Sequence, residues 1–276
     1  MRLRGRCEDE PAAIIPAVSS TSALIVLSSA VLLLTPLLWQ LAGTQPMALL
    51  PLLPVIAWLV TAAQWVRSRG LLWGLAPGVL LGLGLYTSQA AVVMMPAFLA
   101  ITVAILVQAR VVPWRQAAIC LAAFAVCASP MLITWLRHPE QLRLAINTHH
   151  LYDADRYYPW QGAREIASWV GLTARSEVYW DYFNPAFLFL TGGVLFPPLI
   201  VLLPIGLFAL LREESTPLTR LWLAGLAVAP LAAALTAETP IPARAIYITP
   251  FAAIIAAVGI QYLLALARNL HPRQPS

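Results

Sequence analysis

Charge is scarce in this chain, and lysine is absent from it. Charged residues make up 11% of the 276 residues, and each of the 17 Lys or Arg positions is an arginine. Soluble domains carry roughly 25% charged residues, so this sequence lacks the charge that covers an ordinary water-exposed surface. The absence of lysine also excludes a lysine-dependent nucleotide-binding loop and a Schiff-base mechanism.

Cysteine is rare, and the common hydrolase motif is missing. The three cysteines, Cys7, Cys120 and Cys127, form no Cys-x-x-Cys pair, so neither a disulfide framework nor a zinc site is implied. Cys120 and Cys127 lie inside an apolar run, where a small apolar role is expected. Gly-x-Ser-x-Gly does not occur, and no Ser-His-Asp set can be argued from residue order.

Long apolar runs dominate what is present. Hydrophobic residues form 60% of the chain, and its mean hydropathy is +0.77. Runs of about 20 apolar residues match the length that crosses a bilayer as a helix. We therefore predict an all-α, polytopic transmembrane helical bundle of about eight spans. The predicted spans are residues 22–43, 46–66, 71–87, 91–109, 115–136, 193–211, 219–236 and 246–267.

The spans divide the chain into five predicted segments. Residues 1–21 are a cytoplasmic leader, and residues 22–136 hold the first five spans. Residues 137–192 are a loop on the outer face. Residues 193–267 hold the last three spans, and residues 268–276 are a cytoplasmic tail.

Arginine placement predicts the orientation. The net charge of +5 and pI of about 9.4 would suit nucleic-acid binding, but the arginines stand singly or in pairs at the ends of apolar runs. Every second connection is basic, which predicts cytoplasmic termini, a plasma (inner) membrane location and no nucleic-acid partner. The long loop also carries arginines, which long translocated loops tolerate. The basic connections hold Arg2, Arg4, Arg6, Arg67, Arg69, Arg110, Arg115, Arg212, Arg220, Arg268 and Arg273.

Glycine recurs at four-residue spacing in the third predicted span. Gly74, Gly78 and Gly82 would share one helix face, and small residues at this spacing let a second helix approach closely. A phosphate-binding glycine loop would need a preceding strand and a water-exposed loop. We therefore interpret these glycines as a packing face.

Polar residues gather in the predicted outer loop. Residues 147–161 read NTHHLYDADRYYPWQ, and residues 179–193 read YWDYFNPAFLFLTGG. This aromatic content argues against disorder, so we expect short interfacial helices that roof a cavity. His149, His150, Asp153 and Asp155 are a weak candidate for a divalent metal site. A solvated loop start is the favoured interpretation, and no cofactor is predicted.

Three runs of sequence resemble a known enzyme family. They are GVLLGLGLYTSQAAVVMMP (78–96), NPAFLFLTGG (184–193) and PIPARAIYITPFAAIIAAVG (240–259). Together and in this order they resemble bacterial relatives of dolichyl-phosphate-mannose protein mannosyltransferases, which belong to the GT-C superfamily of glycosyltransferases. The resemblance implies transfer of a hexose or pentose from a polyprenyl-phosphate carrier at the outer membrane face, with membrane lipids and the carrier as partners.

The resemblance also implies a set of site residues. Arg244 matches the late arginine of the family, which is thought to face the carrier phosphate. Polar and aromatic residues of the predicted outer face are candidates for the substrate cavity. They are Tyr86, Gln89, His149, His150, Asp153, Asp155, Arg156, Tyr157, Tyr158, Asn184 and Glu238.

The chain departs from the family pattern in ways that concern catalysis. The catalytic acid of the family lies in a first outer loop that has no counterpart here, and the acidic residues 8–10 fall on the predicted cytoplasmic side. Val92 or Val93 replaces a frequent arginine, and Gly193 replaces a frequent aspartate. We therefore expect the C-terminal two-thirds of such an enzyme, through truncation, gene splitting or a misplaced start, with a second chain as a partner that would supply the rest.

Two other functions remain open at this point. One is a non-catalytic membrane subunit, and the other is a transporter of lipid-linked or small solutes. A transporter would be favoured by charges within the spans or by inverted hydropathy repeats, and the sequence shows neither.

The orientation can be tested by labelling single cysteines in a cysteine-free background. Gln161→Cys should react with a membrane-impermeant thiol reagent in intact cells because it lies in the outer loop. Gln274→Cys should react only after the cells are permeabilised, because the tail is cytoplasmic. The reverse labelling pattern would contradict the predicted topology.

Overall fold

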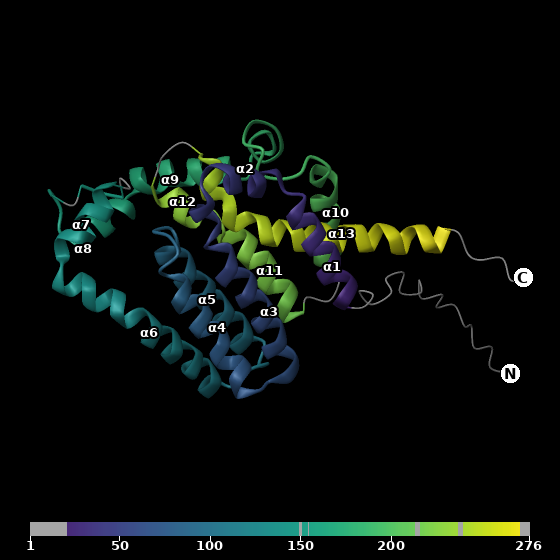
Figure 1. Ribbon diagram of the computed structural model, residues 1–276, viewed down its shortest axis with the longest axis horizontal. Coiled ribbons are helices and arrows are strands. Elements are labelled where there is room, and N and C mark those ends of the chain that lie inside the picture. The colour runs from purple at the N-terminus through teal and green to yellow at the C-terminus, as the bar shows by residue number, and fades with distance from the viewer. Residues whose placement is uncertain (1–20, 149–150, 154, 213–215, 237–239, 271–276) are drawn as a thin grey trace, which may run out of the picture.

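The protein is all-α wherever the structure is described. The computed structural model describes residues 21–148, 151–153, 155–212, 216–236 and 240–270, and over these residues it contains helices and no strand (Figure 1). Residues 1–20 of the predicted leader, residues 271–276 of the tail, and the residues His149, His150 and Glu238 lie outside these ranges.

Several helices are long and apolar enough to cross a bilayer. Within the described residues, five such spans are present, and α1 (Thr21–Leu33) with α2 (Pro36–Thr44) forms a sixth if the pair, bent by 53°, is one span. The chain is therefore a multi-pass membrane protein, as the sequence predicts. The five are η1 (Pro46–Leu49) with α3 (Leu52–Ser68), α5 (Ala91–Gln108), α6 (Trp114–Arg137), α11 (Pro217–Val228) with α12 (Leu231–Leu235), and η3 (Pro242–Ile248) with α13 (Thr249–Leu270).

Three of the predicted spans differ in shape from simple crossing helices. The third and sixth correspond to α4 (Leu71–Gly84) and α10 (Leu199–Arg212), which have 14 residues each. Gly193, with φ of 55°, and the following Pro197 and Pro198 delay the start of α10. The first span is bent because Pro36 has no backbone N–H and its ring disfavours a continuous helix.

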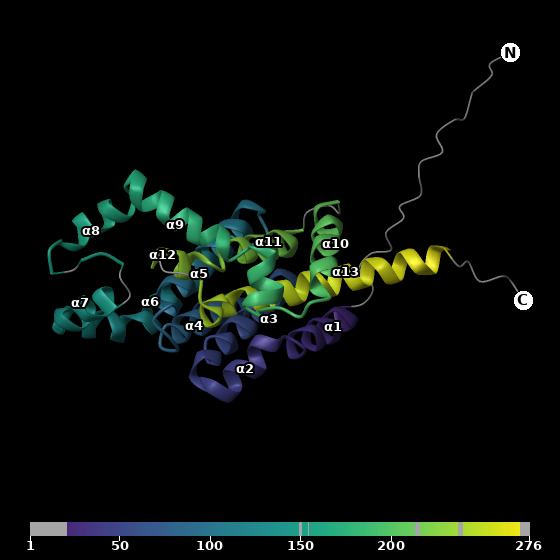
Figure 2. The ribbon, with the colours of Figure 1, turned by 90° about the horizontal axis from the view of Figure 1, so that it is seen from above.

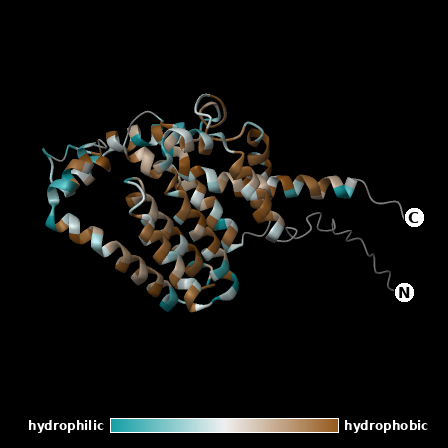
Figure 3. Ribbon diagram, in the orientation of Figure 1, coloured by the Kyte–Doolittle hydropathy of each residue, from teal (hydrophilic) through white to brown (hydrophobic). Residues whose placement is uncertain are grey.

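The long loop folds into short helices, as predicted. They are α7 (Pro139–Thr148), α8 (Pro159–Ile166), α9 (Trp169–Asp181) and the π-helical turn η2 (Phe187–Thr191). In Figures 1 and 2, α7 and α8 extend to one side of the bundle, at the far end from the C-terminal part of α13. Polar residues concentrate on α7 and α8, whereas the bundle helices are largely apolar (Figure 3).

The three basic connections within the bundle, at 67–69, 110–115 and 212–220, lie together at one end. Gln116, at the start of α6, donates from Nε2 to the carbonyl oxygen of Arg69 at 3.2 Å and accepts from Trp65 Nε1 at 3.1 Å. Arg67 and Thr216 line one cavity, which brings the 212–220 connection to the same end. The arginine-poor connections meet at the other end, where Ser88 Oγ lies 3.2 Å from Tyr247 Oη.

Glycines allow the helices to pack closely. A Cβ atom on Gly78 would overlap the carbonyl oxygen of Cys120 in α6, and one on Gly82 would lie 2.5 Å from Cys127 Cβ. The predicted packing face is therefore confirmed, with α6 as the partner of Gly78 and Gly82 and Trp65 of α3 as the partner of Gly74. Gly206 makes an equally close contact with Ile255, which joins α10 to α13.

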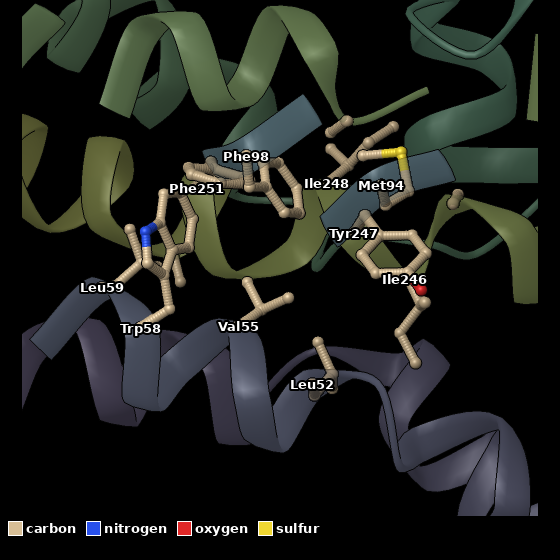
Figure 4. Close-up of a cluster of buried hydrophobic side chains, with 14 of the residues drawn as sticks. Leu52, Val55, Trp58, Leu59, Met94, Phe98, Ile246, Tyr247, Ile248 and Phe251 are labelled. Carbon is tan, nitrogen blue, oxygen red and sulfur yellow. The ribbon is translucent and has the colours of Figure 1, made fainter. Parts of the chain in front are cut away.

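An aromatic cluster fills the centre of the bundle. Trp58 of α3 stacks on Phe98 of α5 with ring centroids 4.9 Å apart, and Phe251 of α13 meets Trp58 edge to face at 6.2 Å (Figure 4). The indole N–H of Trp58 donates to Thr102 Oγ1 at 3.1 Å. This bond satisfies a polar group where neither water nor lipid tails offer a partner.

The close contact at Gly78 predicts a stability effect. We expect Gly78→Ala to lower the free energy of unfolding by about 1–3 kcal/mol, because α4 and α6 must separate to admit the Cβ atom. Gly43→Ala is the matched control, since nothing lies within 4 Å of its Cβ position. Thermal unfolding in detergent micelles measures both variants, and equal melting temperatures would contradict the close approach.

Candidate functional site

Arg244 is held at the end of the bundle where the arginine-poor connections meet. It lies in η3, half-buried, and its Nη1 donates to Thr236 Oγ1 at 2.7 Å. Thr236 in turn donates to the carbonyl oxygen of Ala233 at 2.8 Å. The guanidinium is therefore tied to the end of α12, and this end of the bundle presents a fixed cation.

The segment around Arg244 is anchored on both sides. The backbone N–H of Ile241 donates to Tyr182 Oη at 3.1 Å, which connects η3 to the residue that follows α9. Tyr247 is buried and its hydroxyl hydrogen-bonds Ser88, which also accepts from the N–H of Ala91 at 3.2 Å. These contacts join η3 to the turn that precedes α5.

Arg175 organises the long loop of residues 137–192, a role that the sequence did not predict. Its guanidinium donates to three backbone carbonyl oxygens: Leu235 at 3.0 Å, Leu151 at 2.9 Å and Gly171 at 3.1 Å. Leu235 precedes Thr236, so Arg175 connects the loop to the residue that holds Arg244. Burial lowers the pKa of Arg175, and the nearby carboxylate of Glu165 acts in the opposite direction.

Tyr179 of α9 and Tyr182, which directly follows the helix, attach α9 to the bundle. Tyr179 donates to the carbonyl oxygen of Ala227 at 2.5 Å, and burial raises its pKa. Tyr182 is fully buried. Arg175, Tyr179 and Tyr182 stand at i, i+4 and i+7, the spacing of one helix face. This spacing is the signal from which Arg175 could have been identified.

The two predicted site aspartates, Asp153 and Asp155, form hydrogen bonds within their own segment and none with Arg244. Asp153 Oδ1 accepts the backbone N–H groups of Asp155 and Arg156, both at 3.1 Å, and Asp155 Oδ2 accepts from Asn147 Nδ2 at 3.0 Å. The guanidinium of Arg156 lies 5.4 Å from the ring centre of Tyr157. The carboxylates are exposed and stabilise a local turn, so this cluster has a structural role.

The remaining predicted cavity residues make separate contacts or are exposed. Tyr86 donates to the carbonyl oxygen of Cys127 at 2.8 Å and so ties α4 to α6. Asn184 Oδ1 accepts the N–H of Ala186 at 2.9 Å, just before the π-helical turn η2. Gln89 and Tyr158 are exposed.

The metal hypothesis finds no cluster to support it in the described part of the chain. Among these residues, no group of three or more His, Cys, Asp or Glu side chains is close enough to hold an ion. His149 and His150, on which the hypothesis depends, are not among them.

Replacing Arg175 should loosen the outer loop. We expect Arg175→Gln to accelerate protease cleavage within residues 151–185 by about tenfold, because several hydrogen bonds from a charged donor are lost. Arg164→Gln, an exposed position on α8, is the control and should cleave at the wild-type rate. Limited proteolysis in micelles gives both rates, and equal rates would show that Arg175 does not hold the loop.

Comparisons with known proteins identify no relative of this chain. No protein family matches it, and neither a curated protein nor a solved structure does.

Proposed function

We propose that this chain is a GT-C-like glycosyltransferase component that binds a polyprenyl-phosphate-linked sugar at the outer membrane face. The observation that carries the proposal is Arg244, a half-buried arginine held by Thr236 where the arginine-poor connections converge. Its place in the third family-like run, PIPARAIYITP, adds to the argument.

The chemistry of the donor calls for such a cation. When a sugar leaves a phosphate carrier, negative charge develops on the departing phosphate, and a preorganised positive group stabilises it. A guanidinium is always charged and can engage two phosphate oxygens at once. The bond to Thr236 limits the rotamers of Arg244, so less ordering is needed when the phosphate binds.

The proposal includes a topology of eight crossings. The short helices α4 and α10 then cross the membrane with the residues that flank them, and both termini are cytoplasmic. Support comes from the grouping of the basic connections at one end of the bundle, since arginine is enriched on the cytoplasmic side of inner-membrane proteins. Arg244 then faces the outer side, where lipid-linked sugars serve enzymes of this type.

The proposal assigns the general base to a second chain. Activation of an acceptor hydroxyl requires a base within hydrogen-bond reach. The carboxylates of Asp153 and Asp155 are engaged in their own turn, so neither is suited to that role. A partner that carries an acidic outer loop would complete the site.

The second candidate is a non-catalytic membrane subunit, which the same engagement of Asp153 and Asp155 favours. The two candidates differ in turnover. A catalytic chain transfers sugar once its partner is present, whereas a subunit supports the partner and binds no donor phosphate through Arg244.

The donor-site proposal predicts the effect of a conservative substitution. Arg244→Lys should weaken binding of a polyprenyl-phosphate mannose by about tenfold or more, because an ammonium does not reproduce the bidentate contact. Thr236→Val keeps the positive charge of Arg244 but removes the hydroxyl that its guanidinium bonds. This variant should weaken donor binding by a smaller factor.

Arg164→Lys is the matched control, since it makes the same change at an exposed site on the outer loop. Binding is measured by fluorescence titration in micelles, and thermal unfolding checks that each variant is folded. If Arg244→Lys binds the donor as the wild type does, Arg244 serves only to anchor its segment among the headgroups.

A further inference from the structure

A cavity runs from the middle of the bundle to the end opposite Arg244. It has a volume of about 380 Å³, is half open, and is lined by α1, α3, α11 and α13 together with Leu210 of α10. Its walls are largely apolar, with Leu32, Ile56, Trp222 and Ile254 among them. This volume falls within the range of roughly 300–1,000 Å³ that small-molecule sites occupy.

Most polar groups of the cavity lie at one end, while Ser28 and Ser29 of α1 line its wall. Gln64 and Arg67 come from the last turn of α3, and Thr216 and Thr219 from the start of α11. Thr216 Oγ1 accepts the N–H of Thr219 at 3.2 Å and so caps α11. A helix N-terminus carries partial positive charge, so Arg67 and α11 both favour an anion at this position.

A buried glutamine extends the polar end. Pro250, Ile254 and Val258 line the cavity from one face of α13, and Gln261 follows Val258 on that face. Both amide atoms of Gln261 are buried and have no hydrogen-bond partner among the described residues. Burying an unpaired amide is costly, so Gln261 marks a further polar position on α13, about one turn beyond the last residue of that helix that lines the cavity.

We propose that this cavity binds an anionic phospholipid from the leaflet at the basic end of the bundle. One acyl chain lies between α1, α3 and α13, and the phosphate faces Arg67 and the N-terminus of α11. The three connections at this end carry six arginines and two glutamates, a net charge of +4, which complements an anionic headgroup. The site is separate from the donor site, since Arg67 and Arg244 lie at opposite ends.

A lipid chain fits the cavity better than a protein helix does. A helix with side chains is about 10 Å across, so 380 Å³ would hold about one turn of it. An acyl chain is narrow and flexible and can follow an apolar channel with a polar group at one end only. The cavity wall is largely apolar, and most of its polar residues are grouped at one end. This arrangement suits an amphiphile with one acyl chain in the cavity.

Native mass spectrometry of the full chain in non-ionic detergent tests the proposal. The probes are phosphatidylglycerol and phosphatidylcholine with identical acyl chains, added at equal concentrations. We expect one phosphatidylglycerol to be retained per chain, about fivefold tighter than phosphatidylcholine. Arg67→Gln should lose this preference. Arg115→Gln removes a cation at the same end but outside the cavity, and should keep it.

A second variant tests the cavity itself. Ala63 lines the wall, and Ala63→Phe should fill the space and lower the affinity for both lipids by about tenfold. Ser29→Phe fills it from the facing helix α1 if Ala63→Phe does not fold. Lipid retention that both filling variants leave unchanged, or an equal loss in Arg67→Gln and Arg115→Gln, would overturn the proposal. A dimer that a filling variant dissociates would identify a second copy of the chain as the occupant.

Discussion

The bundle depends on helix backbones that approach one another at glycines. Lipid tails are as apolar as leucine, so burial of apolar surface does not by itself drive helices together in a membrane, and close packing must do so. Gly78 lets α4 lie against Cys120 of α6, and Gly206 lets α10 lie against Ile255 of α13. Because α13 is thereby fixed, η3 directly before it is fixed as well, and with it the position of Arg244.

The central aromatic cluster divides the polar parts of the molecule into two regions. Trp58, Phe98 and Phe251 fill the middle with stacked and edge-to-face rings. At one end, hydroxyls, backbone carbonyls and the side chains of Arg175 and Arg244 form a connected network. At the other end, a largely apolar cavity has Gln64, Arg67, Thr216 and Thr219 gathered at one side. The two polar regions are therefore separate from one another.

Arg175 and Arg244 differ in the groups that accept their hydrogen bonds. Arg175 donates to three backbone carbonyls from three segments, and such contacts hold a loop in place. Arg244 donates to a threonine hydroxyl, and a phosphate oxygen is a stronger acceptor for a guanidinium. Arg175 therefore positions the loop, and Arg244 remains the residue of the proposed donor site.

Composition and residue spacing determined the fold class, the locations of the apolar helices, the glycine face of α4 and the helical character of the outer loop. Each of these depends on residues near one another in the chain and on a membrane that satisfies no backbone polar group. The tertiary structure decided which polar residues work together. Arg175 meets Leu235 across 60 positions, whereas Asp153 and Asp155 turn to their own neighbours. Such pairings depend on how the helices pack, and helix packing depends on side-chain fit between segments far apart in the sequence.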